Sequence, residues 1–124
     1  MRMKLITIDE KQLKDYLVLV QKMKELTPEK AAAQAEKMAC SKNKAEKRVI
    51  YRGLVGAQLK NVVHIASRYR GAGVTFAVLI AAGNRALISH IKNLDASGAA
   101  NFMESCCWHI EGAVMDCVVE ARKK

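Results

Sequence analysis

The clearest pattern of apolar and polar positions lies between residues 44 and 70. Apolar side chains recur there at intervals of three and four, which at about 100° per residue gather on one side of a helix. They are Tyr51, Leu54, Val55, Leu59, Val62, Ile65, Ala66 and Tyr69. The opposite side is small, polar and basic, with Gly53, Gly56, Ala57, Lys60, Asn61, His64, Ser67 and Arg68. We predict a long helix with one face in the core and a second face that a neighbour or ligand approaches closely.

Two earlier helices are predicted from caps and periodicity. Thr7 and Glu10 match a capping box that would begin a first helix, and residues 3–8 are either its extended lead-in or a short strand. The stripe of this helix is Leu13, Tyr16, Leu17, Val20, Met23 and Leu26. Thr27 and Pro28 begin a second helix, which should run to about Cys40 and is rich in alanine. With so little apolar area, the second helix must pack closely or lie on the surface.

The long helix should begin after a cap at Asn43 and end at the glycines of residues 71–73. A fourth element covers residues 74–94 with period 3.6, although residues 74–80 alone could also form a buried strand. Asp95 or Ser97 would cap a last helix that runs to about Ala121. Its core stripe is Phe102, Met103, Cys106, Ile110, Ala113, Val114, Cys117 and Val118. The predicted fold class is therefore all-α.

Length and composition agree with a compact bundle of four to five helices. The 124 residues are enough for one hydrophobic core but not for two, so we expect a single domain over residues 1–124. One proline, seven glycines and 5% aromatic residues favour short-looped helices over a sandwich or barrel. The longest apolar run, residues 76–82, is too short to cross a bilayer, and the first residues lack a secretory apolar segment. We expect a cytoplasmic protein with reduced cysteines.

The positive charge is unevenly distributed. The net charge is +9, yet residues 95–124 hold three Lys and Arg against five Asp and Glu, and residues 37–70 hold nine against Glu46 alone. Such a local excess attracts a polyanion, and the small residues around it would let a backbone come close. The candidate nucleic-acid-binding residues, for DNA or RNA, are Lys44, Lys47, Arg48, Arg52, Lys60, Arg68 and Arg70. The competing interpretation is a helix packed tightly on a neighbour through its small residues.

The residue patterns of enzymes and metal sites are weak in this chain. Cys106, Cys107 and His109 lie close in sequence, but Cys106 falls on the core stripe and no group is placed to orient His109. Cys106 and His109 could share a metal, but Cys117 is about 16 Å away along the helix and no paired CxxC supports a site. No phosphate-binding glycine motif is present. We predict no catalytic residues, no metal and no cofactor.

A second apolar stripe on the last helix is the candidate protein interface. It consists of Trp108, Met115 and Val119, lies more than about 120° from the core stripe, and could serve self-association or a protein partner. The alternative is that another part of the same chain covers Trp108. Glu104, Glu111, Asp116 and Glu120 lie outside the core stripe and are expected to face solvent.

The leading functional prediction is a non-enzymatic basic helical protein that binds nucleic-acid backbone, as an oligomer or as a small subunit of a ribonucleoprotein assembly. In size and charge the chain resembles the small helical subunits of CRISPR ribonucleoprotein effectors, a likeness that assigns no residues. Two alternatives remain open. One is a protein-interaction module, an adaptor or an inhibitor of an acidic partner, that uses the Trp108 surface. The other is a binder of small phosphorylated ligands at an oligomer interface through Asn84, Arg85 and His90.

Overall fold

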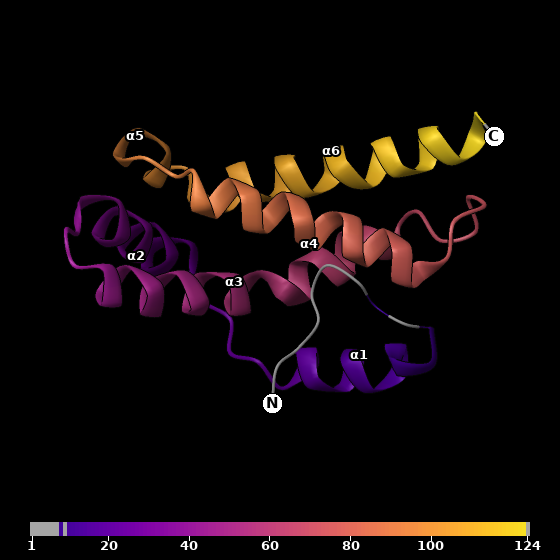
Figure 1. The fold of residues 1–124 in the computed structure, drawn as a ribbon, viewed down its shortest axis with the longest axis horizontal. Helices are drawn as coiled ribbons and strands as arrows, with labels where there is room; N and C mark the ends of the chain where they lie inside the picture. The colour runs from indigo at the N-terminus through magenta and orange to yellow at the C-terminus, as the bar shows by residue number, and fades with distance from the viewer. Residues whose placement is uncertain (1–7, 9, 124) are drawn as a thin grey trace.

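The computed structural model describes residues 8 and 10–123, and every regular element among them is helical (Figure 1). The elements are η1 (Glu10–Gln12), α1 (Leu13–Gln21), α2 (Pro28–Cys40), α3 (Lys44–Ser67), α4 (Phe76–Lys92), α5 (Ala96–Ala99) and α6 (Phe102–Arg122). The prediction of an all-α bundle is confirmed, and residues 76–80 belong to a helix, not to a strand. The predicted cap at Thr7 and the possible strand at its lead-in fall outside the described residues, apart from Ile8.

Most helix boundaries agree with the caps predicted from the sequence. The Thr27 hydroxyl accepts a hydrogen bond from the Lys30 backbone N–H (3.2 Å), and the Asn43 side chain accepts one from the Ala45 N–H (2.9 Å). These bonds satisfy backbone groups that a helix start leaves without an intrahelical partner. After α3, Gly71 and Gly73 have φ of 85° and 90°. Residues that carry a Cβ rarely adopt these positive φ values, whereas glycine adopts them readily. The sequence therefore defines where α2 and α3 begin and where α3 gives way to a loop.

The prediction of one continuous last helix from residue 95 is wrong. Asp95 does cap a helix, because its Oδ1 accepts a hydrogen bond from the Gly98 N–H at 3.0 Å, but this helix is the four-residue α5. Asn101, with φ −111° and ψ 36°, then leaves the helical conformation, and α6 begins at Phe102. Glycine and asparagine have low helix propensity, and the buried side chain of Phe102 anchors the new start in the core.

Helix α4 is the centre of the bundle and packs on both α3 and α6 (Figure 1). Helix α2 packs on α3, α5 and α6, so its alanines serve close packing, with Ala31 and Ala35 fully buried. The close approach around α4 depends on Gly83, because a Cβ there would lie 2.8 Å from Val62 Cγ1 and 3.2 Å from Ile110 Cγ2. Side chains of α3, α4 and α6 thus meet in one core.

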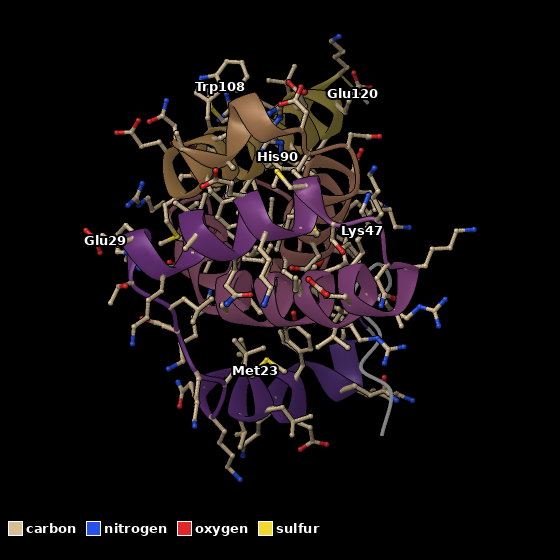
Figure 2. The ribbon with its side chains drawn as sticks, turned by 90° about the vertical axis from the view of Figure 1, so that its left-hand side faces the viewer. Met23, Glu29, Lys47, His90, Trp108 and Glu120 are labelled. Carbon is tan, nitrogen blue, oxygen red and sulfur yellow. The ribbon has the colours of Figure 1, made fainter. Side chains whose placement is uncertain are left out.

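Helix α1 lies against α3, on the side of α3 away from α6 (Figure 2). Its buried Tyr16 hydroxyl accepts a hydrogen bond from the side-chain amide of Asn84, which is itself fully buried in α4 (2.9 Å). Burial raises the pKa of Tyr16, which keeps the phenol neutral. This hydrogen bond links α1 to α4 across a mainly apolar surface.

Candidate nucleic-acid interface

Four of the predicted binding residues lie together on the first three turns of α3. Lys44, Lys47, Arg48 and Arg52 are all exposed, and we call them the N-terminal basic cluster. Within the described part of the chain, none of them forms an ion pair with a carboxylate. Lys44 and Lys47 also lie in the first turn, at the positive end of the helix dipole, which adds to the attraction for anions.

The N-terminal basic cluster borders a surface pocket of about 440 Å³ between α2, α3 and the end of α4. Lys44, Lys47 and Arg48 contribute to its wall, and Lys92 contributes a fourth cation from α4. The apolar part of the lining consists of Met38, Ala39, Tyr51, Ile91 and Leu94. The sequence pattern assigned Tyr51 to the core, but the structure leaves it half-buried in this wall, and burial raises the pKa of its phenol. The site therefore combines several cations with an apolar surface.

Lys60 is separated from this cluster and already has a partner. Its ammonium lies 3.9 Å from a Glu25 carboxylate oxygen, and its side chain is about one-third exposed (34%). The helix face around it is less open than predicted, because Ala57 is buried and the Met23 sulfur lies 3.8 Å from where a Gly56 Cβ would be. Only Gly53 among these small residues has open space beside it. In the middle of α3, the small residues Gly56 and Ala57 therefore face a close neighbour in the same chain.

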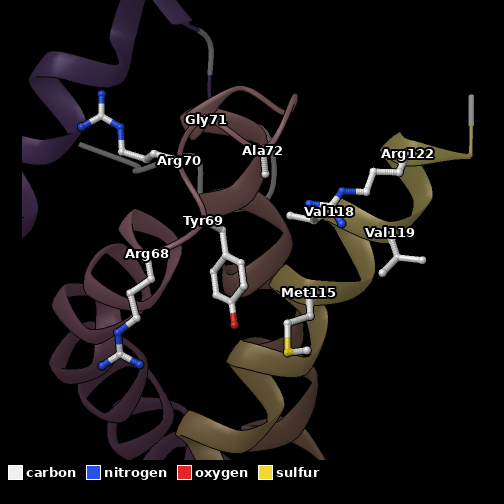
Figure 3. Close-up of a pocket in the computed structure, with 9 residues that line it drawn as sticks. All are labelled: Arg68, Tyr69, Arg70, Gly71, Ala72, Met115, Val118, Val119 and Arg122. Atoms are coloured by element: carbon white, nitrogen blue, oxygen red, sulfur yellow. The ribbon is translucent and has the colours of Figure 1, made fainter.

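Arg68 and Arg70 lie at the other end of α3, beside a second pocket of about 460 Å³. Figure 3 shows that their guanidinium groups point in different directions and do not converge on Arg122, which comes from α6. The Arg70 guanidinium lies 4.6 Å from the ring centroid of Phe76, a cation–π contact, and an Arg68 nitrogen lies 3.4 Å from His64 Nε2. These arginines are therefore held by their own chain.

The seven predicted residues do not form one continuous surface. Helix α3 has 24 residues, so its ends are about 36 Å apart. The structure brings Lys44, Lys47, Arg48 and Arg52 together, leaves Lys60 paired midway, and places Arg68 and Arg70 at the far end. Sequence reasoning missed Lys92 and Arg122 because each comes from another helix. In the sequence, each is a basic residue in the last turn of a helix. Basic residues are common at helix C-termini, so this position does not indicate a binding site.

The candidate protein interface is exposed along the outer side of α6. Trp108, Met115 and Val119 are 76%, 47% and 48% exposed, so no described part of the chain covers them. Trp108 projects from the outer edge of the bundle (Figure 2). Of the acidic residues on this helix, Glu104, Asp116 and Glu120 are exposed as expected. Glu111 is half-buried and accepts a hydrogen bond from the Tyr69 hydroxyl at 2.9 Å.

The third candidate site is not assembled. Asn84 is buried and bonded to Tyr16, Arg85 is exposed on another side of α4, and His90 lies near Ser105, whose hydroxyl is 2.9 Å from His90 Nε2. Among the described residues of one chain, these three side chains therefore have separate surroundings.

Cys106, His90 and His109 lie close together where α4 meets α6. Cys106 is fully buried, and burial is the main reason that the pKa of its thiol rises to about 12. His109 stacks on His90, with ring centroids 4.2 Å apart. No group of three or more possible metal ligands occurs among residues 8 and 10–123. In the same range, every helix is too short or too polar to cross a membrane.

Comparison with known proteins shows a similarity to a bacterial RNA polymerase factor. No family model matches the chain. The chain is 30% identical over 115 residues to the RNA polymerase sigma factor SigA of Clostridium acetobutylicum. The match covers 93% of this chain but 29% of the sigma factor, so the chain spans less than a third of the length of this relative.

Proposed function

We propose that this chain is a non-enzymatic helical module that binds nucleic-acid backbone through the N-terminal basic cluster of α3. The observation that carries the proposal is the grouping of Lys44, Lys47, Arg48 and Arg52 on one exposed end of α3, with Lys92 beside them. Phosphate contacts of this kind supply most of the affinity of non-specific nucleic-acid binding. Arg68 and Arg70 contribute less, because their guanidinium groups are engaged by their own chain.

The similarity to a sigma factor supports the same proposal and suggests the protein partner. That relative is by name a factor of RNA polymerase. We therefore propose that this chain acts in an assembly that contains RNA polymerase and nucleic acid, with RNA polymerase as the protein partner.

The experiment is fluorescence anisotropy with labelled single- and double-stranded DNA and RNA at low salt. The test variant is Lys47→Glu/Arg48→Glu, and the matched control is Lys22→Glu/Lys24→Glu, which changes the net charge equally at exposed positions outside the cluster. The test variant should lose at least about tenfold in affinity, since two phosphate contacts become repulsive. The control should lose much less. Equal losses in both variants would show that net charge alone drives binding and would refute the assigned site.

A second candidate function is protein binding through the outer side of α6. The exposure of Trp108 (76%) favours it, because tryptophan is enriched among the residues that dominate interface energies. Salt separates the two functions. Backbone binding should weaken steeply between about 50 and 200 mM salt, whereas a contact anchored by tryptophan should change little.

A further inference from the structure

We propose that the outer side of α6 is a self-complementary surface on which two copies of this chain form an antiparallel, two-fold symmetric dimer. The inference goes beyond nucleic-acid binding and does not depend on it. It rests on three features of α6: an exposed apolar stripe, an open hollow within that stripe, and opposite charges placed symmetrically about its middle. The occupant of the stripe is therefore a second α6.

The apolar stripe runs along the helix directly opposite the core. Trp108, Met115 and Val119 lie within about 40° of one another around the helix axis, as expected for residues seven and four apart. The core residues Ile110 and Val114 are fully buried on the other side. Three exposed apolar side chains therefore lie in one line over about 16 Å.

Gly112 opens a hollow in the middle of this stripe. A Cβ at Gly112 would have no neighbour within 4 Å. The described residues that line the surrounding surface pocket of about 520 Å³ all belong to α6 and include Trp108 and Met115. A helix that presents one large side chain on either side of a glycine offers both a knob and a hole to a second copy of itself.

The positions of these residues match when the two-fold axis passes between Ala113 and Val114. Trp108 then lies opposite Val119 of the second copy, because both are equally far from the axis along the helix. Gly112 lies opposite Met115 of the second copy for the same reason, so that each methionine faces a glycine hollow. Both contacts occur twice, as a two-fold symmetric interface requires.

The charges follow the same symmetry. Glu104 and Arg122 are exposed, lie about 40° to the same side of Trp108, and stand at nearly equal distances from the axis. In an antiparallel pair, residues on the same flank face one another, so Glu104 meets Arg122 of the second copy at both ends of the contact. Glu111 lies on the same flank, but its carboxylate is already hydrogen-bonded to Tyr69. The pairing is intermolecular, because Glu104 and Arg122 of one helix are about 27 Å apart.

The contact involves one face of a 21-residue helix. It therefore buries less surface area than the about 1,200–2,000 Å² that stable complexes bury. We therefore expect a dimer that dissociates in the micromolar range. Trp108 is the only tryptophan of the chain, so its fluorescence reports the contact directly. Its emission should shift to shorter wavelength as the protein concentration rises and Trp108 leaves water.

The test is sedimentation velocity and Trp108 emission over a concentration series of the full chain, without nucleic acid. Glu104→Arg and Arg122→Glu should each be monomeric, because each places like charges opposite one another, and both should keep the helical circular dichroism of the parent. An equimolar mixture of the two variants should dimerise, since both pairs are then of opposite charge. Trp108→Ala should weaken the parent dimer at least about tenfold.

Several results would overturn the dimer. A chain that stays monomeric at all concentrations would mean that another protein or a nucleic acid occupies the stripe. A dimer that survives Trp108→Ala, or a mixture of charge variants that stays monomeric, would place the contact elsewhere. An assembly that grows beyond two copies would show a head-to-tail contact instead. None of these results bears on backbone binding by the N-terminal basic cluster, so the two proposals fail separately.

Discussion

Substitution of Gly83 by alanine tests whether the three central helices pack as closely as the structure shows. The new Cβ would lie 2.8 Å from Val62 Cγ1 and 3.2 Å from Ile110 Cγ2. Such overpacking costs about 1–3 kcal/mol, while alanine gains about 1 kcal/mol over glycine within a helix. The net effect should be a loss of about 1 kcal/mol in the free energy of unfolding. Urea unfolding followed by far-ultraviolet circular dichroism measures this value.

Gly53→Ala is the matched control, because it brings the same gain in helix propensity without a steric clash. Gly53 also lies inside a long helix, but a Cβ there would meet nothing within 4 Å. This variant should therefore be more stable than the parent by about 0.5–1 kcal/mol. The difference between the two variants isolates the steric cost at Gly83. Equal stabilisation by both substitutions would refute the close packing of α3, α4 and α6.

A double-mutant cycle with Val62→Ala identifies the clashing partner. Alone, Val62→Ala removes two buried methyl groups and should cost about 2 kcal/mol. In the Gly83→Ala background the same change removes the 2.8 Å contact, so it should cost about 1 kcal/mol less. Strictly additive effects would contradict the assignment of the clash to Val62.

Three further predictions concern buried polar groups. Tyr16→Phe removes the phenol oxygen that lies 2.9 Å from the buried side-chain amide of Asn84. The free energy of unfolding should fall by about 1–2 kcal/mol. Amide hydrogen exchange should become faster in α1 than in the other helices. The pKa of His90 is lowered chiefly by burial. Near the ordinary pKa of 6.5, the unfolded chain therefore binds more protons than the folded chain. The free energy of unfolding should fall as the pH drops below this value. His90→Gln should lose this part of the pH dependence in urea titrations. Because burial raises the pKa of Cys106 to about 12, iodoacetamide at about pH 8 should label exposed Cys40 in the folded protein and Cys106 only after unfolding, which peptide mass spectrometry would show.

The helices of this protein are predictable because their signals are local. Thr27 and Asn43 are caps whose hydrogen bonds involve backbone groups two or three residues away, and period 3.6 identifies residues 76–92 as a helix. The break between α5 and α6 was missed because the apolar stripe of the last helix gives no signal at the asparagine that ends the helical conformation. Only tertiary burial of Phe102 distinguishes a new helix start from a continuation.

The candidate site was predicted only in part, since it depends on which helices meet. Periodicity placed Lys60 on an open basic face, but it contains no information about Glu25, which follows α1 and pairs with Lys60 at 3.9 Å. Lys92 joins Lys47 because the end of α4 lies beside the start of α3, a contact between segments far apart in sequence. The sequence left open whether another part of the chain covers Trp108, and the structure leaves this side chain 76% exposed.

The most direct test of the central claim is the salt dependence of nucleic-acid binding by the parent and by Lys47→Gln/Arg48→Gln. If both side chains contact phosphates, the slope of log K against log salt should fall in magnitude by about two in this variant, since each phosphate contact contributes about one unit. Lys22→Gln/Lys24→Gln, with the same change of charge, should keep the parental slope. A parental slope in both variants, or no binding at low salt, would contradict the assignment of the N-terminal basic cluster as a nucleic-acid interface.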